Sequence, residues 1–178
     1  QRQKEQLKLS KIDIKKNSKL NWLYPNLKNK KTRFALIVPG GSLKRKYKRI
    51  PIEVYSSIIE FLLEKKIKPV LIGSIDDQQI CQTLKKKFLK LENLCNKTDF
   101  FKIAKLSKEA IISLGNDTGP MHLISRGNNP TIVFFTKFSD SKLCAPQGKN
   151  VSIAKYNYNN LVFGKKVIEK IQRLIINQ

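Results

Sequence analysis

The sequence predicts an α/β fold in which helices cover both faces of a doubly wound parallel sheet. Three observations point to it. Short, continuous apolar runs recur along the chain, and such runs are typical of strands buried on both faces. Segments with the apolar spacing of amphipathic helices separate these runs. Turn-forming residues, such as Pro39-Gly40-Gly41-Ser42, follow them. In this fold class, ligands bind in the crevice at the carboxyl ends of the strands.

The first expected elements form two strand–helix units. Residues 34–38 (Phe-Ala-Leu-Ile-Val) predict a buried strand, and a helix is expected near 52–66 with apolar residues on one face. The run Pro-Val-Leu-Ile at 69–72 predicts a second strand, which Gly73 stops. A helix near 76–89 follows, because Ile, Leu and Phe recur there at helical spacing.

The middle of the chain repeats this layout. Residues 93–95 predict a short, weak strand, and a helix is expected near 99–107 with Thr98 or Asp99 as its N-cap. The apolar run at 110–114 predicts a central strand.

The last expected elements complete the sheet. A short helix near 120–126, closed by Gly127, leads to a buried strand at 131–135. Residues 151–154 predict a final strand, and residues 164–176 predict an amphipathic helix.

The chain of 178 residues fits one domain preceded by a linker. Residues 1–32 are rich in lysine and lack apolar periodicity, so they predict a linker or interdomain segment. Residues 33–178 predict the folded domain.

The net charge is strongly positive, with 36 Lys and Arg residues against 13 Asp and Glu residues, a formal +23. One interpretation is that the excess lysines lie on solvated faces and have no specific partner, because a strongly AT-biased coding sequence would produce such a composition. The other is attraction to anionic partners, and here an inner-leaflet membrane surface is favoured over nucleic acid.

Cysteine and histidine usage excludes several chemistries. Cys81, Cys95 and Cys144 are widely spaced and odd in number, which predicts neither a disulfide framework nor a zinc site and favours a reduced, cytoplasmic compartment. No apolar run approaches the ~20 residues needed to span a bilayer, so the expected protein is soluble or peripheral to the inner membrane. Because His122 is the only histidine, no His-based triad or multi-histidine metal site is possible within the chain. No metal and no cofactor is expected.

The most informative segment is Gly-Asn-Asp-Thr-Gly-Pro-Met-His at residues 115–122. It joins an expected strand to a helix with proline in its first turn, where free backbone N–H groups and a partial positive charge favour a phosphate. Asp117, Thr118 and His122 offer hydrogen bonds to a ribose or sugar hydroxyl. Helix capping, a tight turn and an ordinary surface histidine are the alternative interpretations of these residues.

Two other strand ends face the same crevice. Residues 39–42 let backbone N–H groups approach an anion and run into the basic stretch at 44–49, although neither a Walker A motif nor a dinucleotide-binding glycine motif is present. At residues 73–77, Ser74 or an acidic side chain is a candidate contact to a base or ribose, and a helix N-cap explains these residues equally well.

At these motifs the sequence resembles glycosyltransferase family 9, the ADP-heptose:lipopolysaccharide heptosyltransferases. The stretch from Gly115 to Leu123 is similar to the family signature Asp-Thr-Gly-Pro-Met-His-Leu. The order of the other matches is also that of the family, and the resemblance covers about residues 20–176. The other matching segments are Pro39-Gly40-Gly41-Ser42, Lys48-Arg49-Ile50-Pro51, Leu71-Ile72-Gly73 and Asn96-Lys97-Thr98.

The resemblance implies the Rossmann-like C-terminal half of a GT-B glycosyltransferase, which binds the nucleotide-sugar donor. It implies that Ser42 and Lys48 contact the donor diphosphate, with Lys48 stabilising the leaving group without a metal. It further implies a donor-binding set completed by Gly41, Thr98, Asp117, Thr118, Gly119 and His122. Ile50 departs from the family's usual tryptophan, Ile124-Ser125 from its usual Ala-Ala, and Ile75 from a frequent acid.

The expected function is therefore donor binding, with ADP-heptose as the implied sugar donor and a lipopolysaccharide-type acceptor. The general base and most of the acceptor site are expected in an N-terminal domain or partner chain, because residues 1–32 cannot supply them. On this interpretation the chain is incomplete, contains no catalytic base and is inactive alone. The alternatives are a basic module that binds nucleic acid or anionic membranes, and another GT-B enzyme that uses a UDP-sugar.

Overall fold

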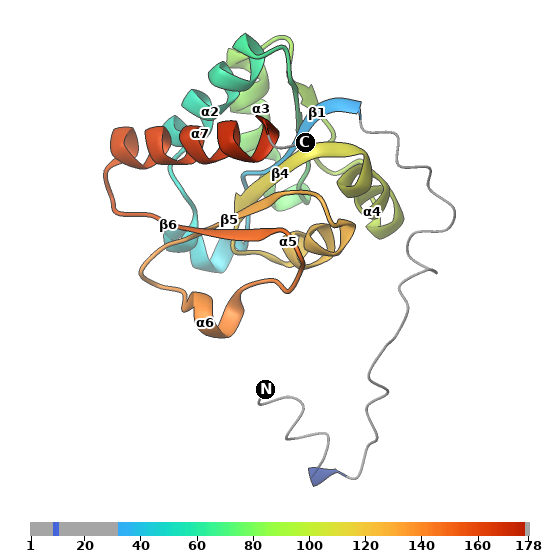
Figure 1. The fold of residues 1–178 in the computed structure, drawn as a ribbon, viewed down its shortest axis with the longest axis vertical. Helices are drawn as coiled ribbons and strands as arrows, with labels where there is room; N and C mark the ends of the chain where they lie inside the picture. Colours follow the sequence, from blue (N-terminus) through green and yellow to red (C-terminus); the bar gives the residue numbers. More distant parts are fainter. Residues whose placement is uncertain (1–8, 11–31, 177–178) are drawn as a thin grey trace.

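The computed structural model describes residues 9–10 and 32–176 (Figure 1). The segment predicted to be a linker lies almost entirely outside the described residues, so the division into 1–32 and 33–178 stays a prediction.

The described chain forms one six-stranded sheet in which all strands are parallel and the order is β3-β2-β1-β4-β5-β6. This is the order of a Rossmann-like doubly wound sheet, and it confirms the expected fold class. The strands are β1 (Thr32–Val38), β2 (Lys68–Leu71), β3 (Glu92–Asn93), β4 (Ala110–Asn116), β5 (Thr131–Phe135) and β6 (Val151–Lys155).

Helices lie on both faces of the sheet (Figure 1). One face is covered by α2 (Ile52–Glu64), α3 (Gln78–Lys87) and α7 (Asn160–Ile176), and the other by α4 (Phe100–Glu109) and α5 (Gly119–Ile124). Short helical segments also occur in the connections. They are η2 (Leu43–Lys48) after β1, η3 (Ile75–Asp77) after β2, η4 (Ser125–Gly127) after α5 and α6 (Ser141–Cys144) after β5.

The core has two apolar layers because the central strands are buried on both faces. Ile37 and Leu114 pack toward α2 and α7, whereas Leu36 and Val133 pack toward α4 and α5. Ala35–Val38 and all of β5 are buried, as the continuous apolar runs predict. The sheet is therefore covered by helices, and its carboxyl edge is left to form a site.

Two short helices were not expected from the sequence, and several boundaries differ by a few residues. The segments η2 and α6 were not expected as helices, because short polar and basic runs carry no apolar periodicity. Helix α7 begins at Asn160 rather than at 164, and β3 spans only Glu92–Asn93 rather than 93–95.

The end of the helical segment formed by α5 and η4 also differs from expectation. The left-handed residue is Asn128 (φ 64°), not Gly127. Gly127 is required for a different reason, since a Cβ there would lie 2.5 Å from Ser107 Oγ of α4. The glycine thus serves close packing between helices rather than helix termination.

Candidate functional site

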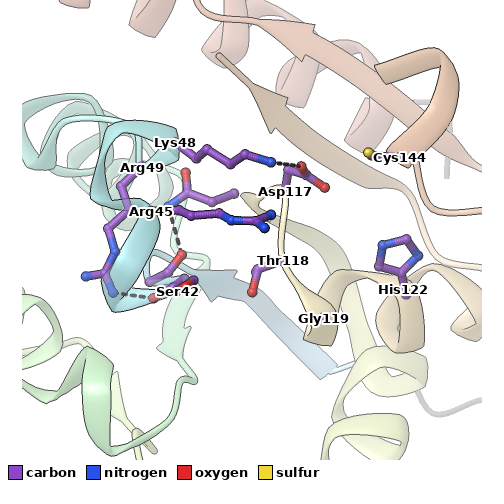
Figure 2. A pocket seen from close by; sticks show the side chains of 12 residues that line it. Ser42, Arg45, Lys48, Arg49, Asp117, Thr118, Gly119, His122 and Cys144 are labelled. Atoms are coloured by element: carbon purple, nitrogen blue, oxygen red, sulfur yellow. Dashed lines mark hydrogen bonds and ion pairs between the residues drawn. The ribbon is translucent and has the colours of Figure 1, made fainter. Parts of the chain in front are cut away.

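A cavity of about 450 Å³ opens at the carboxyl ends of β1 and β4 (Figure 2). The chain leaves β1 toward β2 and later returns to β4 on the other side of β1, so this is the topological switch point of the sheet, where doubly wound folds bind ligands. The lining residues come from the β1–α2 connection, the β4–α5 junction and α6: Gly40, Gly41, Ser42, Arg45, Lys48, Arg49, Asn116, Asp117, Thr118, Gly119, His122 and Cys144.

The structure brings most of the predicted site residues together around this cavity. They arrive from two segments far apart in sequence: Gly41, Ser42 and Lys48 from the β1 side, and Asp117, Thr118, Gly119 and His122 from the β4 side. Thr98 does not line the cavity. It lies before α4, where Asp99 and not Thr98 provides the N-cap, through a 2.7 Å hydrogen bond from the backbone N–H of Lys102.

Asn116 fixes the two sides of the cavity relative to one another. Its side-chain amide donates to the carbonyls of Pro39 (2.8 Å) and Gly40 (2.9 Å). Its Oδ1 accepts from the backbone N–H of Ile50 and from the Tyr55 hydroxyl. Asn116 is buried, and both the nitrogen and the oxygen of its side chain are hydrogen-bonded. Through these bonds, β4 holds the loop after β1 in place.

Asp77 plays a comparable role from η3. One carboxylate oxygen accepts from the Gly41 backbone N–H (2.9 Å) and pairs with Arg49 (3.2 Å), while the other accepts from the backbone N–H and the hydroxyl of Ser74. Ser74 and Asp77 form a capping box. Of the two interpretations for residues 73–77, the structure therefore shows the capping one. A Cβ at Gly40 would clash with the Asp77 carboxylate, which explains the glycine.

Lys48, Asp117 and Ser139 form a polar cluster at one wall. Lys48 Nζ lies 3.8 Å from Asp117 Oδ2 (Figure 2). It also donates to Ser139 Oγ at 3.2 Å, and the Ser139 hydroxyl donates to Asp117. All three side chains are partly buried. The Asp117 carboxylate is thus oriented by a cation and a hydroxyl, and Lys48 presents its remaining donor capacity to the cavity.

The β4–α5 junction continues the cavity lining from Asp117 to Gly119. Thr118 is the N-cap residue of α5 and makes no capping hydrogen bond with its side chain, and Pro120 occupies the first turn. The first N–H groups of a helix have no partner within the helix. A Cβ at Gly119 would meet nothing within 4 Å, so this backbone is open to the cavity.

The cavity carries more positive than negative charge. Arg45, Lys48 and Arg49 line it, against the single carboxylate of Asp117. Arg49 Nε is buried and has no hydrogen-bond partner among the described residues. A polar cavity of this sign suits an anionic ligand with hydroxyl groups.

Several residues of the site were not singled out by the sequence motifs. Arg45 and Arg49 lie in a run of Lys and Arg residues, and the sequence does not show which of these side chains reach the cavity. Cys144 comes from the unexpected helix α6. Asn116 lies inside the motif at 115–122, so its position was a usable signal. Ser139 carried no signal, because its contacts span more than 20 residues in sequence.

A second groove of about 570 Å³ lies at the carboxyl ends of β5 and β6. Ser139 belongs to its lining and also contacts Lys48 and Asp117, so the groove adjoins the cavity. The groove is lined by Phe135, Thr136, Lys137, Phe138, Ser139, Asp140, Ser141, Lys155 and Tyr156.

Within the described part of the chain, no group of three His, Cys, Asp or Glu residues is placed to hold a metal ion. The expectation of a metal-free and cofactor-free site stays a prediction. In that same part, no helix is long and apolar enough to cross a membrane.

The sheet order and the cation-rich cavity at its switch point define a Rossmann-like domain with a cavity where doubly wound folds bind ligands. Residues 1–170 match the family model of glycosyltransferase family 9 (heptosyltransferase), and the chain belongs to that family. No curated protein matches the sequence significantly.

Solved structures share the fold. E. coli heptosyltransferase WaaC with ADP has a TM-score of 0.74 at 21% identity, over 94% of this chain and 53% of that one. E. coli ADP-heptose lipopolysaccharide heptosyltransferase II has a TM-score of 0.73 at 16% identity (93% and 53%). A family 9 glycosyltransferase from Veillonella parvula has a TM-score of 0.71 at 18% identity (83% and 47%). The chain spans about half the length of these structures.

Proposed function

We propose that this domain binds the nucleotide-sugar donor of a glycosyltransferase, with the donor diphosphate in the cavity between β1 and β4. The observation that carries the proposal is the convergence of Lys48 and the open backbone of Gly119 on one cavity at the switch point. Family membership supplies the reaction class, transfer of a glycosyl group.

In this proposal the residues around the cavity have different tasks. The open backbone at Gly119 and the Lys48 ammonium bind phosphate oxygens and neutralise the charge that develops on the leaving diphosphate. Asp117 is a carboxylate and would repel phosphate, so its role is to orient Lys48 and to accept hydrogen bonds from sugar hydroxyls. Ser42, Thr118 and His122 add hydrogen-bond donors at the cavity wall. Thr98 is assigned to the nucleoside end, outside the cavity.

The proposed donor is ADP-heptose and the proposed acceptor is of the lipopolysaccharide type. The support is the description of the similar structures, one as an ADP-heptose lipopolysaccharide heptosyltransferase and one as a heptosyltransferase with ADP. We also propose that no metal takes part, since basic side chains line the position where the diphosphate would lie.

We propose that the general base comes from a second domain or a partner chain. The one carboxylate that lines the cavity, Asp117, already accepts from Ser139 and pairs with Lys48. Exposed apolar side chains also follow the carboxyl ends of the strands, a position where a second domain would cover them: Leu43, Tyr47, Ile75, Phe138 and Leu143. Contact with an anionic cytoplasmic membrane face, favoured by the charge of +23, belongs to the same proposal.

Calorimetric titration of the purified chain with ADP, UDP and a short single-stranded DNA, at low and high salt, tests the proposal. We expect saturable ADP binding that persists at high salt and exceeds UDP binding. Lys48→Ala and Asp117→Ala should each weaken it, while Lys44→Ala, an exposed neighbour that does not line the cavity, should not.

Full ADP affinity in both the Lys48 and the Asp117 variants would remove the assigned site. DNA binding that collapses with salt, without any nucleotide binding, would instead support the basic-module alternative. A preference for UDP would support a UDP-sugar donor.

A further inference from the structure

The three basic side chains that line the cavity, Arg45, Lys48 and Arg49, differ in their ion-pair partners. Lys48 pairs with Asp117 at 3.8 Å, and Arg49 pairs with Asp77 at 3.2 Å. Arg45 makes no ion pair and no side-chain hydrogen bond with any described residue, although it lines the same cavity. Of these three side chains, Arg45 is therefore the one whose positive charge no described residue compensates.

The backbone directs Arg45 differently from its neighbours. Within η2, Arg45 alone has non-helical angles (φ −128°, ψ 47°), so the segment is kinked at this residue. Figure 2 shows the Arg45 side chain extending into the cavity that Lys48, Asp117 and Thr118 line. The neighbouring Lys44 and Lys46 are exposed and do not line it.

The charge balance indicates what Arg45 would bind. The Lys48–Asp117 and Arg49–Asp77 pairs are formally neutral, which leaves Arg45 to attract an anion. A guanidinium presents a planar fork of donors that fits two oxygens of a phosphate group.

We propose that Arg45 binds the diphosphate of the nucleotide-sugar and stabilises it as a leaving group. The inference rests on the proposed function and adds a residue to its site. In the transfer step, the bond between the anomeric carbon and the phosphate oxygen breaks, and its electron pair stays on the diphosphate. The acceptor oxygen forms the new bond and gives its proton to the base. Arg45 keeps its own protons and offsets the charge gained by the diphosphate.

Titration of wild type, Arg45→Gln and Lys46→Gln with ADP and with AMP tests the inference. Both variants lose one positive charge from the same segment, but only Arg45 lines the cavity. We expect Arg45→Gln to weaken ADP binding about tenfold, the usual effect of losing a charged hydrogen bond. Lys46→Gln should bind ADP as wild type does, and the loss for AMP in Arg45→Gln should be much smaller than for ADP.

The outcomes separate this inference from the proposed function. If wild type binds no ADP, the proposed function fails. If wild type binds ADP and Arg45→Gln binds it equally well, the role of Arg45 is wrong and the donor site stands. Equal losses in Arg45→Gln and Lys46→Gln would show a general charge effect and also overturn the inference. Circular dichroism of both variants checks that each is folded.

Discussion

Asp77 connects the segment between β1 and α2, which lines the cavity, to the turn after β2. It contacts the backbone of Gly41 after β1, the guanidinium of Arg49 before α2, and Ser74 after β2. Asp77 itself is buried and does not line the cavity, so its effect on a ligand acts through the loop that it holds. Such a residue supports a site without touching the ligand.

Asp77→Ala should destabilise the fold by about 3 kcal/mol, because it leaves the partly buried Arg49 charge without its partner and removes the hydrogen bonds to Gly41 and Ser74. Urea unfolding measures the change. Asp76→Ala is the matched control, since Asp76 is an adjacent carboxylate that is exposed. Equal stabilities of the two variants would contradict the role given to Asp77.

Cys144 offers a direct report on occupancy of the cavity. It is exposed and lines the cavity, whereas Cys81 and Cys95 are buried, so a maleimide reagent should label Cys144 selectively. We expect saturating ADP to slow this labelling severalfold, measured by mass spectrometry. Cys144→Ser should abolish the labelling. An unchanged rate at an ADP concentration that saturates binding would place the nucleotide elsewhere.

At the scale of elements, the strands were the most predictable part of the fold. Strand β5 lies where its continuous apolar run predicts, because a strand buried on both faces needs apolar side chains at every position. The helices η2 and α6 were missed because their residues are mostly exposed and polar, so no periodicity marks them. Both segments contribute to the cavity, which limited the prediction of the site.

At the start of α4, the sequence left open whether Thr98 or Asp99 caps the helix. Asp99→Ala should cost about 1 kcal/mol of stability, because the Asp99 side chain caps the helix. Thr98→Ala should leave stability unchanged, and a loss of ADP affinity in this variant would support the nucleoside contact implied by the family resemblance. Thermal unfolding and calorimetry give the two readouts. A larger stability loss in Thr98→Ala than in Asp99→Ala would contradict the assignment of the cap.

For the molecule as a whole, burial of weak acids predicts how stability depends on pH. Burial, aided by the neighbouring Cys95, raises the pKa of the Cys81 thiol above its usual 9.0, and burial raises the pKa of Tyr55 well above 10.0. The unfolded chain therefore binds fewer protons than the fold above pH 9. The stability that these groups contribute is complete below pH 9 and is lost as pH rises further.

The free energy of unfolding should thus fall above about pH 9, by up to about 1.4 kcal/mol per pH unit for each such group. Urea titrations between pH 8 and 10.5 measure the slope. Cys81→Ala should reduce it, while Cys144→Ala, which removes an exposed cysteine, should keep the wild-type slope. Identical slopes in wild type and Cys81→Ala would contradict this account.

The site was predictable where a local motif carries it and not where distant contacts build it. The motif at 115–122 and the glycine turn at 39–42 come together because both follow central parallel strands. The contacts of Ser139 with Lys48 and of Asn116 with Pro39 span 91 and 77 positions, so no local pattern reveals them. The net charge of +23 was the least specific signal, because it does not show which cations are already paired.

The central claim is that the cavity between β1 and β4 binds the donor nucleotide. The most direct test is an amide chemical-shift titration of the isotope-labelled chain with ADP. The account predicts that the largest shifts fall on the backbone N–H groups of Gly41, Ser42, Lys48 and the segment 117–119. Saturable shifts confined to the second groove, around Lys137 and Lys155, or no shifts at all, would contradict it.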